Sequence, residues 1–79
     1  RRGVIMSMPR TEITMKREGR QITVTNVGKL PAIGVYVESP GYAHEFIASK
    51  NYLWLNPGES QIIEVNVDYP VCVKGWNIN

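Results

Sequence analysis

Apolar and polar residues alternate along several short stretches of this chain, and the alternation predicts β-strands. Residues 11–16 and 21–26 both follow a period of two, which places successive side chains on opposite faces of a strand. Between the two stretches lies Gly19, a residue that tolerates the positive φ of a tight turn. The two stretches therefore predict a hairpin.

The longest alternating stretch is 61–68, and a turn signal precedes it. Pro57 suits the second position of a turn, and Gly58 suits the positive φ of the third, so the segment 56–59 is predicted to reverse the chain. Residues 32–38 form another predicted strand. Its apolar character on both faces is typical of a central strand.

The remaining stretches predict shorter elements. Residues 3–8 form a first strand or a linker, 45–48 a short strand, and 71–77 a final strand. No stretch of ten residues keeps a helical period without Gly or Pro, so no long helix is expected. We predict a single all-β domain over residues 1–79, an antiparallel β-sandwich of about six or seven strands. The predicted core consists of Ile22, Val24, Ile33, Val35, Val37, Ile63, Val65 and Val67.

Composition narrows the class of protein. The chain has 79 residues, of which 43% are hydrophobic and 20% charged, and this balance is ordinary for a folded domain. A net charge of +2 with scattered basic residues gives no reason to expect a nucleic-acid partner, and the lack of an 18-residue apolar stretch gives none to expect a membrane span. Because the first residue is Arg, we expect the chain to be a piece of a longer protein.

Candidate chemistry is sparse. The single histidine, His44, lies far in sequence from the single cysteine, Cys72, and the two do not make up a metal site. Cys72 is expected to be a small buried residue in a strand. The carboxylates are expected at turns and outward strand positions: Glu12, Glu18, Glu38, Glu45, Glu59, Glu64 and Asp68. We therefore expect no catalytic residue, no metal and no cofactor.

Aromatic residues are the remaining candidates for binding. Tyr52 and Trp54 share strand parity and are expected to project from the same face. With Tyr42 they are the predicted binding residues, either for carbohydrate or for another domain. The other aromatic candidates are Tyr36, Tyr69 and Trp76.

Several motifs resemble those of a known family. These are 22–26 ending in Asn26, then Pro31-Ala32, then 51–59 with its Pro-Gly-Glu turn, and last Gly75-Trp76-Asn77. In this combination they are similar to the C-terminal immunoglobulin-like domain of glycoside hydrolase family 2 enzymes, in the β-mannosidase and exo-β-glucosaminidase branch. The chain departs from that pattern at Lys50 and Leu53, where the family tends to have Asp and Phe.

The resemblance implies an immunoglobulin-like sandwich that is accessory to a catalytic barrel elsewhere in a larger glycosidase, and a bacterial parent that is periplasmic or secreted. Its partners would be the other domains of that parent. Two alternatives stay open at this point: an autonomous carbohydrate-binding module that binds oligosaccharide, and an adhesion or spacer domain.

Overall fold

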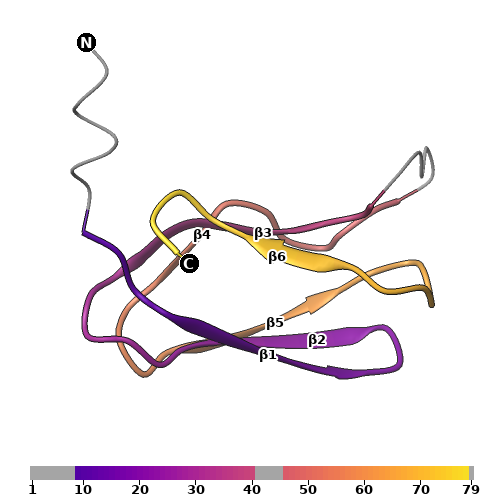
Figure 1. Cartoon of the computed structure of the whole chain (residues 1–79). Helices are drawn as coiled ribbons and strands as arrows, with labels where there is room; N and C mark the ends of the chain where they lie inside the picture. Colours follow the sequence, from indigo (N-terminus) through magenta and orange to yellow (C-terminus); the bar gives the residue numbers. More distant parts are fainter. Residues whose placement is uncertain (1–8, 41–45, 79) are drawn as a thin grey trace, which may run out of the picture.

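The computed structural model describes residues 9–40 and 46–78, and in this part of the chain every regular element is a strand (Figure 1). The strands are β1 (Ile13–Glu18), β2 (Gln21–Asn26), β3 (Ala32–Glu38), β4 (Leu53–Leu55), β5 (Ser60–Glu64) and β6 (Cys72–Lys74). The all-β prediction is confirmed. The predicted strand or linker at 3–8 lies outside the described residues, as do Tyr42, His44 and Glu45.

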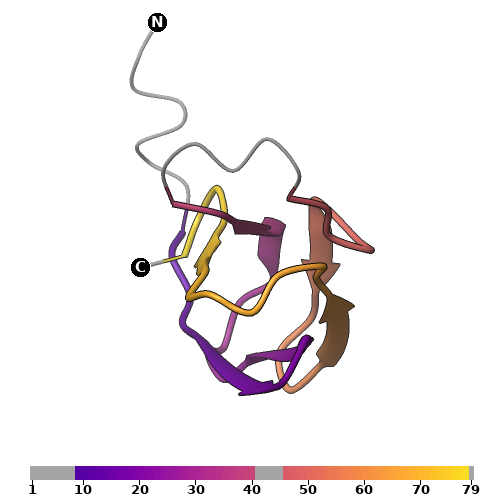
Figure 2. The same ribbon diagram turned by 90° about the vertical axis from the view of Figure 1, so that its right-hand side faces the viewer.

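The strands form two antiparallel sheets that face one another. One sheet has the order β1-β2-β5 and the other the order β4-β3-β6. The chain passes from one sheet to the other after β2, after β4 and again after β5. Figure 2, turned by 90°, shows the strands of both sheets arranged around a common interior. This arrangement is a β-sandwich.

The predicted hairpin is present as β1 and β2. Glu18 pairs with Gln21, which leaves Gly19 and Arg20 as a two-residue turn. Gly19 has a φ of 62°, and a positive φ at the first turn residue matches the twist of the flanking strands. Strand β1 therefore begins and ends two residues later than the alternation of 11–16 predicted.

The core lies between the sheets and contains most of the residues predicted for it. Ile22, Val24, Val35 and Ile63 are fully buried, and Val37 and Val65 nearly so. Leu55 and Ala32 are also fully buried. Val67 is half-buried and packs against this cluster.

The predicted inward direction of Ile33 is wrong, and a β-bulge explains why. The pairing of β3 with β4 shifts register between Ile33 and Val35, and Gly34 at the bulge has a φ of 69°. The bulge inserts one extra residue, so Ala32 faces the core before it and Val35 after it. Ile33 is left half-buried on the outer side of the sheet.

Three other predicted strands are shorter in the structure. The stretch 61–68 is paired as a strand only to Glu64, after which Val65 forms an isolated bridge with Ala48. That bridge is the only pairing within the described part of 45–48, and the predicted strand 71–77 is confined to Cys72–Lys74.

Arg17 holds the segment that follows β5. Its Nη1 and Nη2 donate to the carbonyls of Tyr69 and Val67, each at 2.7 Å, and Arg20 pairs with Asp68 at 3.0 Å. These bonds hold 67–69 against the β1-β2 hairpin, beyond the point where the pairing of β5 with β2 ends.

The predicted turn at 56–59 is confirmed, and it joins the two sheets. The Glu59 amide donates to the Asn56 carbonyl at 2.9 Å, and Gly58 has a φ of 82°, as a type II turn requires. The Gly58 amide also donates to the Asn26 carbonyl at 2.8 Å. The turn is therefore fixed to the end of β2.

Two buried asparagines secure this end of the sandwich. The Asn26 side chain accepts from the Thr11 hydroxyl and the Gly28 amide and donates to the carbonyls of Leu30 and Leu55. The second, Asn77, accepts from the Ile33 amide and donates to the carbonyls of Pro9 and Pro31. Each side-chain amide is hydrogen-bonded through both its oxygen and its nitrogen, as buried polar groups usually are. Asn26 and Asn77, which belong to the motifs that resemble the known family, therefore stabilise the fold.

Candidate functional site

The outer surfaces of the two sheets differ in chemistry. On the sheet β1-β2-β5 the outward residues are polar with one exception: Thr14, Lys16, Glu18, Gln21, Thr23, Thr25, Ser60, Ile62 and Glu64. Across the strands Thr25 bonds Ser60 at 2.7 Å, and Gln21 donates to Glu64 at 3.3 Å. The outer surface of this sheet is therefore typical of a solvent-exposed surface.

The sheet β4-β3-β6 carries an aromatic outer surface. Register places Trp54 directly opposite Ile33, and Trp76 follows β6 with its amide donating to the Ile33 carbonyl at 2.9 Å. We call this surface the aromatic face and define it by Ile33, Tyr36, Tyr52, Trp54 and Trp76. Tyr52, Trp54 and Trp76 are 65%, 59% and 59% exposed. A row of exposed rings on one sheet is typical of a binding surface.

The bulge at Gly34 positions Trp76. A Cβ built at Gly34 would stand 2.8 Å from Cδ2 and Cε2 of the indole ring. The ring therefore lies against the backbone of β3, where only glycine leaves room for it. Gly34 is buried because the ring covers it, although Trp76 itself is largely exposed.

The other rings are also held in place. Trp54 Nε1 donates to Asn56 Oδ1 at 2.9 Å, so its orientation is tied to the turn that follows β4. The rings of Tyr36 and Tyr52 are 5.3 Å apart with an interplanar angle of 46°. This is the separation of an attractive aromatic pair.

Of the three predicted binding residues, the structure brings two onto one surface. Tyr52 and Trp54 both project from the aromatic face, and Tyr42 lies outside the described residues. The parity argument is wrong for Tyr52, because it precedes β4 and has a φ of 56°. Its place on the face comes from the contact with Tyr36. Trp76 is a further ring on this face that the sequence does not assign to it; the sequence signal for its position is the glycine, Gly34, in the middle of an apolar strand.

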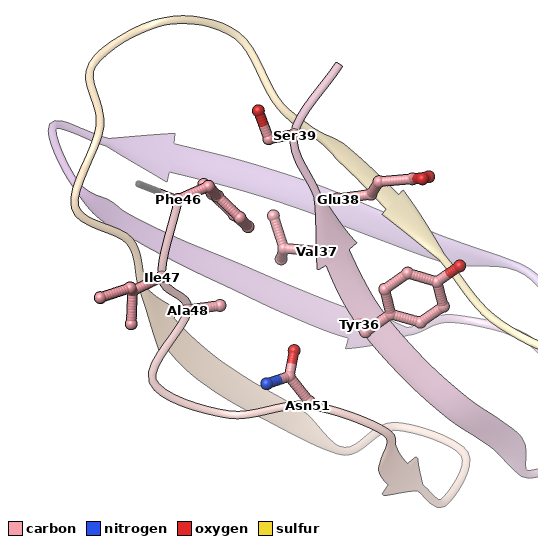
Figure 3. Close-up of a pocket in the computed structure, with 8 residues that line it drawn as sticks. All are labelled: Tyr36, Val37, Glu38, Ser39, Phe46, Ile47, Ala48 and Asn51. Carbon is pink, nitrogen blue, oxygen red and sulfur yellow. The ribbon is translucent and has the colours of Figure 1, made fainter. Parts of the chain in front are cut away.

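A depression of about 460 Å³ lies beside β3 (Figure 3). Val37 and Phe46 point towards one another across it, while Glu38 projects from the other side of β3. Among the described residues that line it, Glu38 is the single carboxylate, whereas glycoside hydrolysis uses two. Val37 belongs to the core, and Phe46 packs against it. The depression is therefore the outer end of the core.

Charged and metal-ligating residues add little to this picture. The hydrogen bond and the charge of Arg20 lower the pKa of Asp68, and Asp68 in turn raises the pKa of Arg20, at an exposed site. In the described ranges no group of three or more His, Cys, Asp or Glu residues could hold a metal ion.

Cys72 is exposed, so the prediction that it is buried is wrong. It pairs with Glu38 in the register of β3 and β6, and both side chains point to the outer side of the sheet.

No helix among the described residues is long and apolar enough to cross a membrane. Two facing antiparallel sheets with three crossings between them define an immunoglobulin-like β-sandwich. The chain belongs to the Ig-fold domain family whose model is named Ig_mannosidase, which matches residues 7–77. The family name associates this domain with mannosidases. Comparison with curated proteins and with solved structures gave no match.

Proposed function

We propose that this chain is a non-catalytic accessory domain of a larger, mannosidase-type family 2 glycoside hydrolase, and that it packs against other domains of that enzyme through the aromatic face. The observation that carries the proposal is the difference between the two outer surfaces. One is polar, and the other exposes Tyr52, Trp54 and Trp76. The association of the family with mannosidases supports the class of parent.

The physical reason is the cost of leaving such a face in water. Burying one aromatic side chain stabilises an interface by about 1.5–3 kcal/mol, and tryptophan and tyrosine are enriched where protein surfaces meet. Domains in one chain commonly pack through surfaces of this kind. A domain packed in this way would stabilise its neighbours and help to shape their relative positions.

Carbohydrate binding by the same rings is the second candidate, because the exposed indole of Trp54 offers a surface on which a sugar ring could stack. Its Nε1 already donates to Asn56, so one of the donors that a sugar hydroxyl would use is occupied. We therefore place this function second.

The test of the proposal has two arms. The 79-residue chain alone is assayed on aryl β-mannosides, and residues 9–78 are deleted from the parent enzyme. We expect no hydrolysis by the chain, and a parent with a lower Tm and reduced turnover. Hydrolysis by the pure chain would overturn the non-catalytic assignment, and a deleted parent with unchanged Tm and turnover would overturn the packing role.

A further inference from the structure

We propose that Trp54, Ile33 and Trp76 are the centre of the docking interface, and that its occupant is an apolar, uncharged surface of another domain in the same polypeptide. This inference rests on the proposed packing function and adds the anchor residues and the chemistry of the partner. The backbones of the three residues are adjacent: Trp54 is the register partner of Ile33 across β4 and β3, and the Trp76 amide donates to the Ile33 carbonyl from the other side.

The anchors are ordered before any partner arrives. The Trp76 ring lies on Gly34, the Trp54 ring is tied to Asn56, and Tyr52 lies against Tyr36. Side chains that are already fixed lose little conformational entropy on binding. Rigid, exposed tryptophans are the residues that most often dominate the energy of an interface.

The charges near these anchors define the chemistry of the partner. Lys74 and Glu38 lie on the outer side of β6 and β3, and Lys74 Nζ is 3.8 Å from Glu38 Oε1. The centre, formed by Ile33 and the two indoles, carries no charged group. An uncharged aromatic centre with a charged rim is the usual anatomy of a protein interface. A charged partner group opposite Ile33 would be buried without a counter-charge, which is costly, so the partner surface is apolar.

The size of the face indicates that the occupant is tethered. Strand β3 has seven residues and β4 and β6 have three each, so at roughly 3.3 Å per residue and about 4.8 Å between strands the sheet has a footprint of roughly 200 Å². A stable complex of separate proteins buries about 800 Å² per partner. A domain in the same chain does not need that area, because a short linker supplies an effective concentration in the millimolar range. A second copy of this chain would lack that advantage.

The experiment compares exposed positions on the two outer surfaces within the full parent enzyme. Trp54→Ala and Trp76→Ala are made in the aromatic face, and Ile62→Ala is the matched control on the polar surface, where Ile62 is 48% exposed. We expect each tryptophan variant to lower the parent's Tm by at least half of the shift caused by deleting 9–78, and Ile62→Ala to leave it unchanged. The same variants in the 79-residue chain report on folding.

The outcomes separate this inference from the proposed function. If deletion lowers Tm but both tryptophan variants behave like Ile62→Ala, the anchors are wrong and the accessory role stands. If deletion itself has no effect, the accessory role fails. If the tryptophan variants lower Tm in the isolated chain as much as in the parent, they act on folding, and the anchor assignment is overturned.

Three further measurements test the occupant. Both tryptophans of the chain lie on the aromatic face, so its emission reports that surface alone. We expect no change in emission with β-1,4-linked mannotetraose up to about 10 mM, and a monomer by sedimentation at about 100 μM. Adding the chain at about 10 μM to the deleted parent should not restore Tm. A saturable emission change would show that the face binds carbohydrate. A dimer would show that it binds a second copy of the chain, and a restored Tm would show that the partner domain needs no tether. Each of these results would overturn the inference.

Discussion

The indole ring of Trp76 lies against the backbone of Gly34 at a distance that leaves no room for a side chain. A Cβ at residue 34 would be 2.8 Å from Cδ2 and Cε2 of the ring, and Gly34 also has a φ of 69°. This one contact connects the β-bulge in β3 to the aromatic face. The contact holds the ring against β3, and the bulge at the same residue decides which residues of β3 face the core.

Replacing Gly34 by alanine should therefore destabilise the domain for two separable reasons. The positive φ costs about 1–2 kcal/mol in a residue with a Cβ, and the contact with the Trp76 ring adds to it. Urea unfolding of Gly34→Ala, Trp76→Ala and the double variant forms a cycle that separates the two. We expect Trp76→Ala to relieve the contact and leave the backbone cost. Additive effects would show that the ring does not lie against Gly34.

The bulge also predicts that alanine substitutions at Ile33 and Val35 lower the free energy of unfolding by different amounts. Val35 is fully buried, so Val35→Ala should lower the free energy of unfolding by about 1–3 kcal/mol. Ile33→Ala removes more atoms but from a half-buried outer position, and it should cost less. Urea denaturation of both variants is the measurement. A larger loss of unfolding free energy for Ile33→Ala would mean that Ile33 faces the core and that β3 has no bulge.

Removing the Asn26 side chain should be among the most damaging polar substitutions. In Asn26→Ala, the carbonyls of Leu30 and Leu55 lose their side-chain donor and the Thr11 hydroxyl loses its acceptor, while the Gly28 amide keeps its bond to the Glu12 carbonyl. Each buried group left without a partner costs about 1–3 kcal/mol, so a total loss above about 3 kcal/mol is expected. Asn56→Ala, at an exposed position, is the control and should change the unfolding free energy by much less.

The turn between the sheets offers a test of backbone strain without a packing effect. A Cβ at Gly58 would meet nothing within 4 Å, but the φ of 82° disfavours any branched residue. We expect Gly58→Val to lower Tm clearly, and Gly58→Asn to lower it less because asparagine tolerates a positive φ at this turn position. Equal Tm values for the wild type and Gly58→Val would contradict a type II turn.

The ion pair between Arg20 and Asp68 should give a small pH dependence of stability. The hydrogen bond and the charge of Arg20 hold the pKa of Asp68 below its ordinary value of 3.8. Because the folded-state pKa is the lower one, the stabilisation is present above the unfolded pKa and is lost as pH falls through the folded pKa. Both side chains are largely exposed, so the effect is modest.

The measurement is the difference in urea midpoint between the wild type and Asp68→Asn as a function of pH. We expect this difference to be largest near neutral pH, to shrink as Asp68 is protonated, and to fall further in about 1 M salt, where the screening length is about 3 Å. A difference that is independent of both pH and salt would assign the effect of the substitution to something other than charge.

Local sequence was sufficient for the hairpin, for the turn at 56–59 and for most of the core. Gly19 and Gly58 stand where a positive φ is needed, and the period of two selects Ile22, Val24 and Ile63 for the interior. These features depend on residues a few positions apart, so the amino-acid order determines them directly.

The aromatic face depended on tertiary structure. Trp54 and Trp76 are far apart in the sequence and come to flank Ile33 only because β4 and β6 pair with opposite edges of β3. The outward position of Ile33 follows from a bulge that no alternating pattern records. Beyond the paired part of β5, the carbonyls of Val67 and Tyr69 accept hydrogen bonds from Arg17, which is distant in sequence. A strand's period specifies which side chains share a face, but the choice of neighbouring strands decides which of those faces meet, and that choice is made by packing across the whole sandwich.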